Sequence, residues 1–172
     1  DDFNISGDLQ NNNEMAVGGN LDTKAITNTG NLKTAGKITG RGVFTNSGEI
    51  LTSNLDIETT GVITNTNKIN VIENSKLKAS SINNGGILTS ENIELLTPTL
   101  VNTGSILADE QIKINNTNLN NTGTIASNDK IELNNSNVIN RNKIESSEVV
   151  LLNLSSYDNT GLIRGNNISL ST

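Results

Sequence analysis

The stretch Asn102-Thr103-Gly104-Ser105-Ile106 decides the fold, because related stretches recur along the whole chain. A similar stretch, Asn121-Thr122-Gly123-Thr124-Ile125, begins nineteen residues further on, and further copies precede and follow these two. Nine copies align on their first Asn, with spacings of 17, 18, 19, 18, 19, 19, 19 and 19 residues. These first residues are Asn11, Asn28, Asn46, Asn65, Asn83, Asn102, Asn121, Asn140 and Asn159. A repeat of this length indicates a solenoid.

Three other positions of the repeat are also restricted. The residue two after the first Asn is Gly or Asn in every copy, and from the second copy onward these are Gly30, Gly48, Asn67, Gly85, Gly104, Gly123, Asn142 and Gly161. Because Gly and Asn adopt a left-handed backbone at low cost, we expect a tight bend at this position. The residue two before the first Asn is apolar in eight copies, and the residue four after it is a large aliphatic residue or Met. We expect both to point inward.

A second segment of each repeat alternates apolar and polar residues, as in Ile93-Glu94-Leu95 and Ile112-Lys113-Ile114. Period-two alternation predicts a strand with one buried and one solvated side. A unit of 17–19 residues holds two or three such short strands and cannot bury its apolar side chains alone, so its copies must stack. The sequence therefore predicts an all-β fold, a parallel β-helix of about nine coils. We expect one continuous domain, with residues 1–27 as an irregular start and 28–172 as regular repeats.

The repeated first Asn, called here the ladder Asn, allows two interpretations. Pointing inward, stacked Asn side chains would hydrogen-bond along the column as an amide ladder and would satisfy backbone groups left unpaired by the bend. Pointing outward, each Asn would simply favour a turn. The nine ladder positions are therefore candidate structural residues.

A hydroxyl residue often follows the ladder Asn, at Thr29, Ser47, Thr66, Thr103, Thr122 and Thr160. We expect these side chains to point outward as a stripe along one edge of the solenoid. Such a polar surface could contact glycans or another rod, or order water. The alternative is that Thr stands there because it favours strands and is soluble.

Composition narrows the classes of function. A net charge of −6 argues against a nucleic-acid partner, and no apolar run reaches the roughly 18 residues of a membrane span, so we expect no membrane insertion. The chain has no Cys and no His, which removes thiol and imidazole chemistry. Asp109 and Asp129 could approach each other on neighbouring coils, but two solvated loop carboxylates are the favoured interpretation. We therefore predict no catalytic residue, no metal site and no cofactor.

The repeated pattern Asn-Thr-Gly-x-Ile followed by Ile-x-Leu resembles the repeats of filamentous haemagglutinin-type exoproteins, over roughly residues 9 to 172. These are the secreted partners of two-partner secretion systems, and they include adhesins and the stalks of contact-dependent toxins. The resemblance implies a right-handed parallel β-helix, export through an outer-membrane transporter as partner, and display outside the cell, secreted or at the bacterial surface. The secretion-signal motifs typical of such proteins are not evident, so we expect a section from a longer rod.

Three functions remain open from the sequence. The first is a non-catalytic adhesive rod that supports cell adhesion by contacting a host-cell glycan or protein receptor. The second is a passive spacer that presents a distal toxin or receptor-binding tip. The third, a carbohydrate-active enzyme on a β-helix, would need clustered carboxylates that the repeat does not place together.

Overall fold

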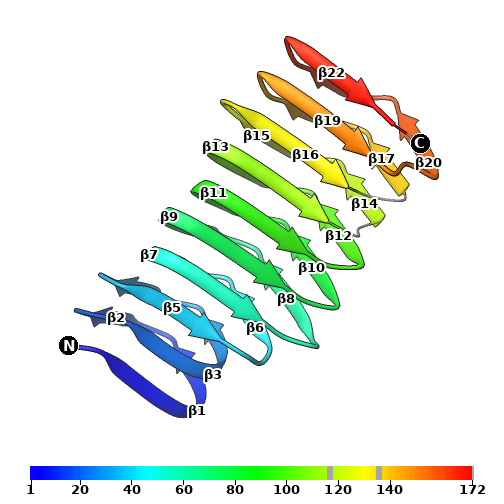
Figure 1. The fold of residues 1–172 in the computed structure, drawn as a ribbon. Coiled ribbons are helices and arrows are strands. Elements are labelled where there is room, and N and C mark those ends of the chain that lie inside the picture. The colour runs from blue at the N-terminus through cyan, green and yellow to red at the C-terminus, as the bar shows by residue number, and fades with distance from the viewer. Residues whose placement is uncertain (116–117, 135–136, 172) are drawn as a thin grey trace.

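The computed structural model is a stack of parallel β-strands that describes residues 1–115, 118–134 and 137–171 and contains no helix there (Figure 1). Every strand pair is parallel, and partners lie about one repeat apart in sequence. The predicted all-β parallel β-helix is therefore confirmed. Residues 1–27 stack on the rest, with an irregular register between Ile5 and Asp8. Residues 116–117, 135–136 and 172 of the predicted repeat region lie outside the described residues.

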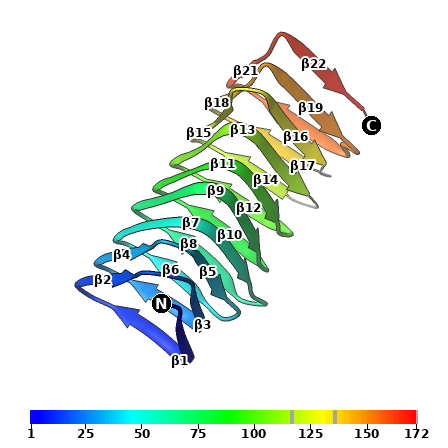
Figure 2. The same ribbon diagram turned by 60° about the vertical axis from the view of Figure 1, so that its left-hand side comes forward.

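Each coil has three faces, each a column of stacked strands (Figures 1 and 2). The first face, which ends at the ladder Asn, contains β6 (Phe44–Asn46), β8 (Val62–Asn65), β10 (Ser81–Asn84), β12 (Thr99–Asn102), β14 (Asn118–Asn121), β17 (Asn137–Asn140) and β20 (Ser156–Asn159). The second face contains β2 (Glu14–Val17), β4 (Asn31–Thr34), β15 (Thr124–Ser127), β18 (Lys143–Glu145) and β21 (Leu162–Arg164). The third face contains β5 (Lys37–Gly40), β16 (Lys130–Asn134), β19 (Glu148–Leu152) and β22 (Asn167–Leu170).

Six longer strands turn a corner and belong to two faces. β1 (Phe3–Asn11) and β3 (Leu21–Asn28) run from the third face onto the first face. β7 (Glu49–Glu58), β9 (Lys68–Lys78), β11 (Ile87–Leu96) and β13 (Ser105–Asn115) run from the second face onto the third. We number the corners in chain order, so that the first corner follows the ladder Asn.

Columns of aliphatic side chains fill the core between the three faces. The first face contributes the residues two before the ladder Asn: Leu9, Ile26, Phe44, Ile63, Ile82, Leu100, Leu119 and Val138. The second face contributes the residues four after it, among them Leu32, Ile50, Ile69, Leu88, Ile106, Ile125 and Ile144. The third face contributes two columns, which include Leu55 with Ile57 and Ile93 with Leu95. Stacking therefore buries apolar area that a single coil would expose.

The ladder Asn side chains point inward and form one hydrogen-bonded column. The Nδ2 of each donates to the Oδ1 of the ladder Asn in the next coil, at 2.7–2.9 Å over eight successive bonds. The column comprises Asn11, Asn28, Asn46, Asn65, Asn84, Asn102, Asn121, Asn140 and Asn159. The same Nδ2 also lies near two backbone carbonyls: that of Asn84 is 3.1 Å from the oxygen of Gly86 and 3.0 Å from that of Ser105. The amides thus satisfy the bend as well as one another.

The prediction of Asn83 as a ladder residue is wrong. Asn84 accepts from Asn65 and donates to Asn102, whereas Asn83 lies on the outer side of β10. The same one-residue error affects Gly85, because the bend glycine is Gly86, and a Cβ on Gly85 would meet only ordinary contacts. It also affects Ile87, which is 43% exposed while Leu88 is buried. The physical reason is strand alternation: Ile82 points inward, so Asn84 must do so as well.

The predicted left-handed bends are not found. No described Gly has a positive φ. Among the described residues, only Asn153 has one. Glycine is required because consecutive coils approach closely: a Cβ on Gly48 would collide with the backbone oxygen of Gly30, and one on Gly104 with that of Gly86. The restriction to small or adaptable residues was read correctly from the sequence, but its cause is contact between coils rather than backbone conformation.

Two bends that carry Asn instead of Gly show the effect of a Cβ atom. After a glycine bend, the next backbone N–H donates to the coil below at 2.6–2.9 Å. After Asn67 the equivalent bond from Lys68 to Gly48 is 3.3 Å, and after Asn142 the bond from Lys143 to Gly123 is 3.2 Å. A side chain at this position therefore moves neighbouring coils slightly apart.

Replacement of Asn84 by Ala should lower the free energy of unfolding by about 3 kcal/mol, because it leaves the Oδ1 of Asn102 and two backbone carbonyls without their buried donor. The matched control is Asn83→Ala, which we expect to change stability by less than about 0.5 kcal/mol. Urea titration of both variants measures the difference. Equal effects of the two substitutions would contradict an inward ladder.

Replacement of Ser75 by Ala should raise the free energy of unfolding by about 1 kcal/mol. Ser75 is stacked between Leu55 and Ile93, and its hydroxyl is a buried polar atom without a hydrogen-bond partner among the described residues. Ser90→Ala is the control, with the opposite expected sign, because the Ser90 hydroxyl donates to the Glu73 carbonyl at 2.9 Å. Thermal or urea unfolding compares the two, and a loss of stability in both would refute the assignment.

Candidate contact surface

A row of exposed hydroxyl residues follows the first corner. We call it the hydroxyl row, and it consists of Thr29, Ser47, Thr66, Thr103, Thr122 and Thr160, all exposed. Each donates its backbone N–H to the carbonyl of a ladder Asn one coil below, as Thr103 does to Asn84 at 2.9 Å and Thr122 to Asn102 at 2.9 Å. The buried ladder therefore sets the position of the row, which Gly85 and Arg141 interrupt.

The hydroxyls of this row differ in whether they form hydrogen bonds within the protein. The Thr29 hydroxyl donates to the Asn12 side chain at 3.0 Å, and that of Thr66 lies 3.3 Å from the Asn46 carbonyl. In the described part of the chain, the hydroxyls of Thr103, Thr122 and Thr160 have no protein partner. These three are free to form hydrogen bonds with a ligand or with water.

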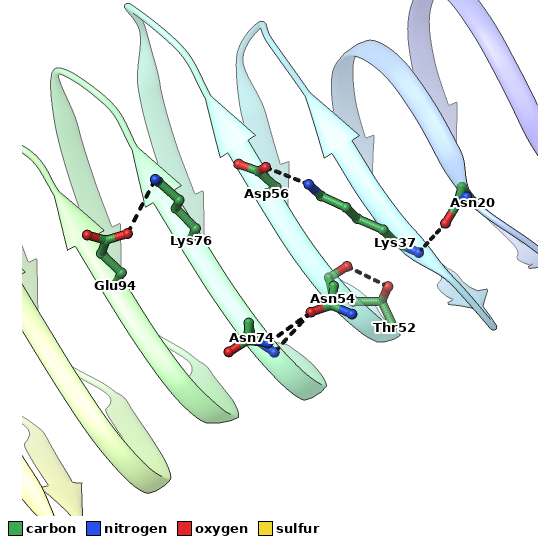
Figure 3. A network of polar contacts seen from close by, with 8 residues as sticks. All are labelled: Asn20, Lys37, Thr52, Asn54, Asp56, Asn74, Lys76 and Glu94. Carbon is green, nitrogen blue, oxygen red and sulfur yellow. Dashed lines mark hydrogen bonds and ion pairs between the residues drawn. The ribbon is translucent and has the colours of Figure 1, made fainter.

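The third face has a different surface, made of charged residues that pair between coils. Lys37 lies 2.6 Å from Asp56, and Lys76 lies 3.4 Å from Glu94, with each partner one coil further on (Figure 3). Lys113 and Glu132 continue the pattern at 3.7 Å. Because these groups are partly exposed, each pair contributes little stability. From Asp56 to Glu132 the signs alternate, so opposite charges stand in register on successive coils.

Exposed amides extend these links at the second corner. The Asn20 side chain accepts the backbone N–H of Lys37 at 2.8 Å, and the Asn54 side chain accepts that of Asn74 at 3.3 Å (Figure 3). The sequence did not reveal this second polar column, because its in-register positions carry Asn, Lys, Gln and Glu in no regular order. Beneath it lie small hydroxyl residues such as Thr34 and Thr52, whose hydroxyls are 2.7 Å apart.

A groove lies along the second corner near the C-terminal end. It has a volume of about 520 Å³, and its lining includes Leu107, Asp109, Asn128, Glu145 and Arg164 from four consecutive coils. Lys143, by a hydrogen bond, and Arg164 hold the pKa of Glu145 below its usual value. The groove offers acceptors and donors to a small polar ligand, and it is open to solvent.

The structure does not stack the two candidate carboxylates, Asp109 and Asp129, directly on each other. Asp129 donates its backbone N–H to the carbonyl of Glu110, so Asn128 rather than Asp129 stands above Asp109. Among the described residues, no group of three His, Cys, Asp or Glu side chains is placed to hold a metal ion. No helix in the described part is long and apolar enough to span a membrane.

Ion pairs also fasten the last described coil to its neighbour. Arg141, which directly follows β17, pairs with Asp158 on β20, and this hydrogen bond holds the pKa of Asp158 below its usual value and raises that of Arg141. Burial raises the pKa of the Tyr157 hydroxyl beside it. The carboxylates Glu145 and Asp158 thus favour the stacked state in their ionised forms.

Comparison with known proteins yields no relative from which a role could be transferred. No family model matches the chain, and no curated protein or solved structure shows a significant match. The geometry of the coils and their surfaces is therefore the basis for a functional proposal.

Acidification should loosen the last described coil before the middle of the rod. A carboxylate with a lowered folded-state pKa stabilises the fold above its ordinary pKa and loses this contribution as pH falls through the lowered value. We therefore expect the protection of backbone amides from hydrogen exchange, relative to their intrinsic rate at each pH, to fall in 156–164 below about pH 4, more than in 81–108. Arg141→Gln should reduce this difference. Protection that falls uniformly along the chain would contradict the assignment.

Proposed function

We propose that this chain is a non-catalytic rod segment of a secreted or surface-displayed bacterial adhesin of the filamentous haemagglutinin type. Its role is to carry a regular, extended surface that supports cell adhesion. Three features support this proposal: the repeated sequence pattern, its resemblance to the haemagglutinin-type repeats, and the stacking of three-faced coils. An outer-membrane transporter of the two-partner type is the partner proposed for export, and a host-cell glycan or protein receptor is the partner proposed for contact.

The single observation that carries the adhesive role is the hydroxyl row. Thr103 and Thr122 stand one coil apart, about 4.8 Å, and present free hydroxyls beside threonine methyl groups. A contact of this kind is weak at each coil and gains strength by repetition along the rod. The buried ladder keeps the spacing constant, so a receptor with a regular array of hydroxyl or amide groups would meet several coils at once.

Binding of the purified chain to a glycan array and to cultured epithelial cells tests the proposal. We expect saturable binding that a defined sugar or receptor fragment competes, and that falls about tenfold or more in the double variant Thr103→Lys/Thr122→Lys, because bulky charges replace the free hydroxyls. The matched control is Ile87→Lys/Thr124→Lys, which adds the same charge to the outer side of the second face.

Two results would contradict the adhesive role. One is the absence of binding at concentrations up to about 1 mM, which would leave a spacer that carries a distal part outward. The other is an equal loss of binding in both double variants, which would indicate a non-specific effect of charge.

A further inference from the structure

The outer side of the first face carries no charged residue over seven consecutive coils. We call this surface the neutral face, defined as the residues one and three before each ladder Asn in these coils. It consists of Ala25, Thr27, Val43, Thr45, Val62, Thr64, Ser81, Asn83, Thr99, Val101, Asn118, Asn120, Asn137 and Ile139. It corresponds to the outer side of the first-face strands β6, β8, β10, β12, β14 and β17 and of the end of β3 (Figures 1 and 2).

Charged residues lie at both ends of this surface and on the other two faces. The pair Asp8–Lys24 lies at its N-terminal end and the pair Arg141–Asp158 at its C-terminal end. The second face carries Glu49 paired in register with Lys68, and the third face carries an outer row of Asp22, Asp56, Lys76, Glu94, Lys113 and Glu132. Charged residues therefore occupy the other two faces and both ends of the neutral face, while the hydroxyl row lies between the neutral face and the second face.

The neutral face also exposes apolar side chains that solubility alone does not favour. Val43 is 53% exposed, Val62 38% and Ile139 39%. Because the backbone groups of a parallel sheet are paired within it, a partner would contact this face through side chains only. Rows of Thr, Val and Asn at the constant spacing of the coils can interdigitate with identical rows.

We propose that two copies of this chain pair laterally through their neutral faces. Each copy carries a net charge of −6, so copies repel one another, and a contact surface without charged residues adds no close like-charge pairs to that repulsion. An interface between identical copies must be self-complementary. The neutral face meets this condition in any register, whereas the alternating charges of the third face would meet like charges in many registers. This inference does not depend on the adhesive role proposed above.

The size of the neutral face predicts weak pairing. Seven coils at about 4.8 Å and four residues across at about 3.3 Å cover roughly 440 Å² on each copy. A standard stable interface buries about 800 Å² per partner, so this contact lies in the class of weak or transient associations. A longer run of such coils would pair more strongly in proportion to its length.

Sedimentation equilibrium of the 172-residue chain at concentrations up to about 1 mM tests the pairing. We expect a monomer–dimer equilibrium that strengthens when salt rises from about 0.02 M to about 0.5 M, because salt screens the repulsion between the copies. The variant Val62→Lys/Asn120→Lys should weaken association about tenfold or more. The control Ile87→Lys/Thr124→Lys should leave it unchanged or nearly so.

A cysteine variant gives a second, independent readout, because the chain has no Cys of its own. Asn83→Cys lies near the centre of the neutral face and should form a disulfide-linked dimer on mild oxidation, while Asn70→Cys on the second face should remain monomeric. A monomer at every concentration, association that weakens with salt, or equal cross-linking of the two cysteine variants would overturn the proposal.

Discussion

The buried asparagine column is the constraint on which the rest of the structure depends. A carboxamide inside an apolar core is costly unless all its hydrogen-bonding groups find partners. From Asn11 to Asn140 each Nδ2 reaches the next Oδ1, and except at Asn121 it also reaches two backbone carbonyls, for example those of Gly86 and Ser105 around Asn84. The Oδ1 of Asn102 and the carbonyl of Ser105 belong to the coil above, so they are within reach only when that coil is in register. The column therefore couples the register of every coil to that of its neighbours, and through the bend it fixes the positions of the residues outside it.

Much of this architecture could be predicted from the sequence, because period and alternation are properties of the chain itself. The sequence correctly predicted eight of the nine ladder positions and the inward residues two before them. It also predicted the apolar–polar alternation of strands such as Ile93 to Leu95. Asn83 was misassigned because Asn83 and Asn84 are chemically identical, and only the inward position of Ile82 distinguishes them. The cause of the Gly preference could not be read either, since the collision of a Cβ on Gly104 with Gly86 involves two coils.

The three faces share one scaffold but have different surface chemistry. The third face pairs charges such as Lys37 with Asp56 across coils, the first corner presents free hydroxyls at Thr103 and Thr122, and the neutral face excludes charge from Thr27 to Ile139. These patterns require knowing which side of each strand faces outward, so the sequence suggested only the hydroxyl row. In a solenoid the core sets the spacing, and each outward row is then free to vary, so that one repeat can serve stacking, solubility and contact.

The most direct test of the ladder is the hydrogen-exchange rate of the Asn side-chain amides, measured by nuclear magnetic resonance on the folded chain. The account predicts that the Nδ2 hydrogens of the seven interior ladder residues (Asn28, Asn46, Asn65, Asn84, Asn102, Asn121 and Asn140) exchange far more slowly than those of outward residues such as Asn83 and Asn120. Uniformly fast exchange of all Asn side chains would contradict a buried, hydrogen-bonded column and with it the register that the column imposes.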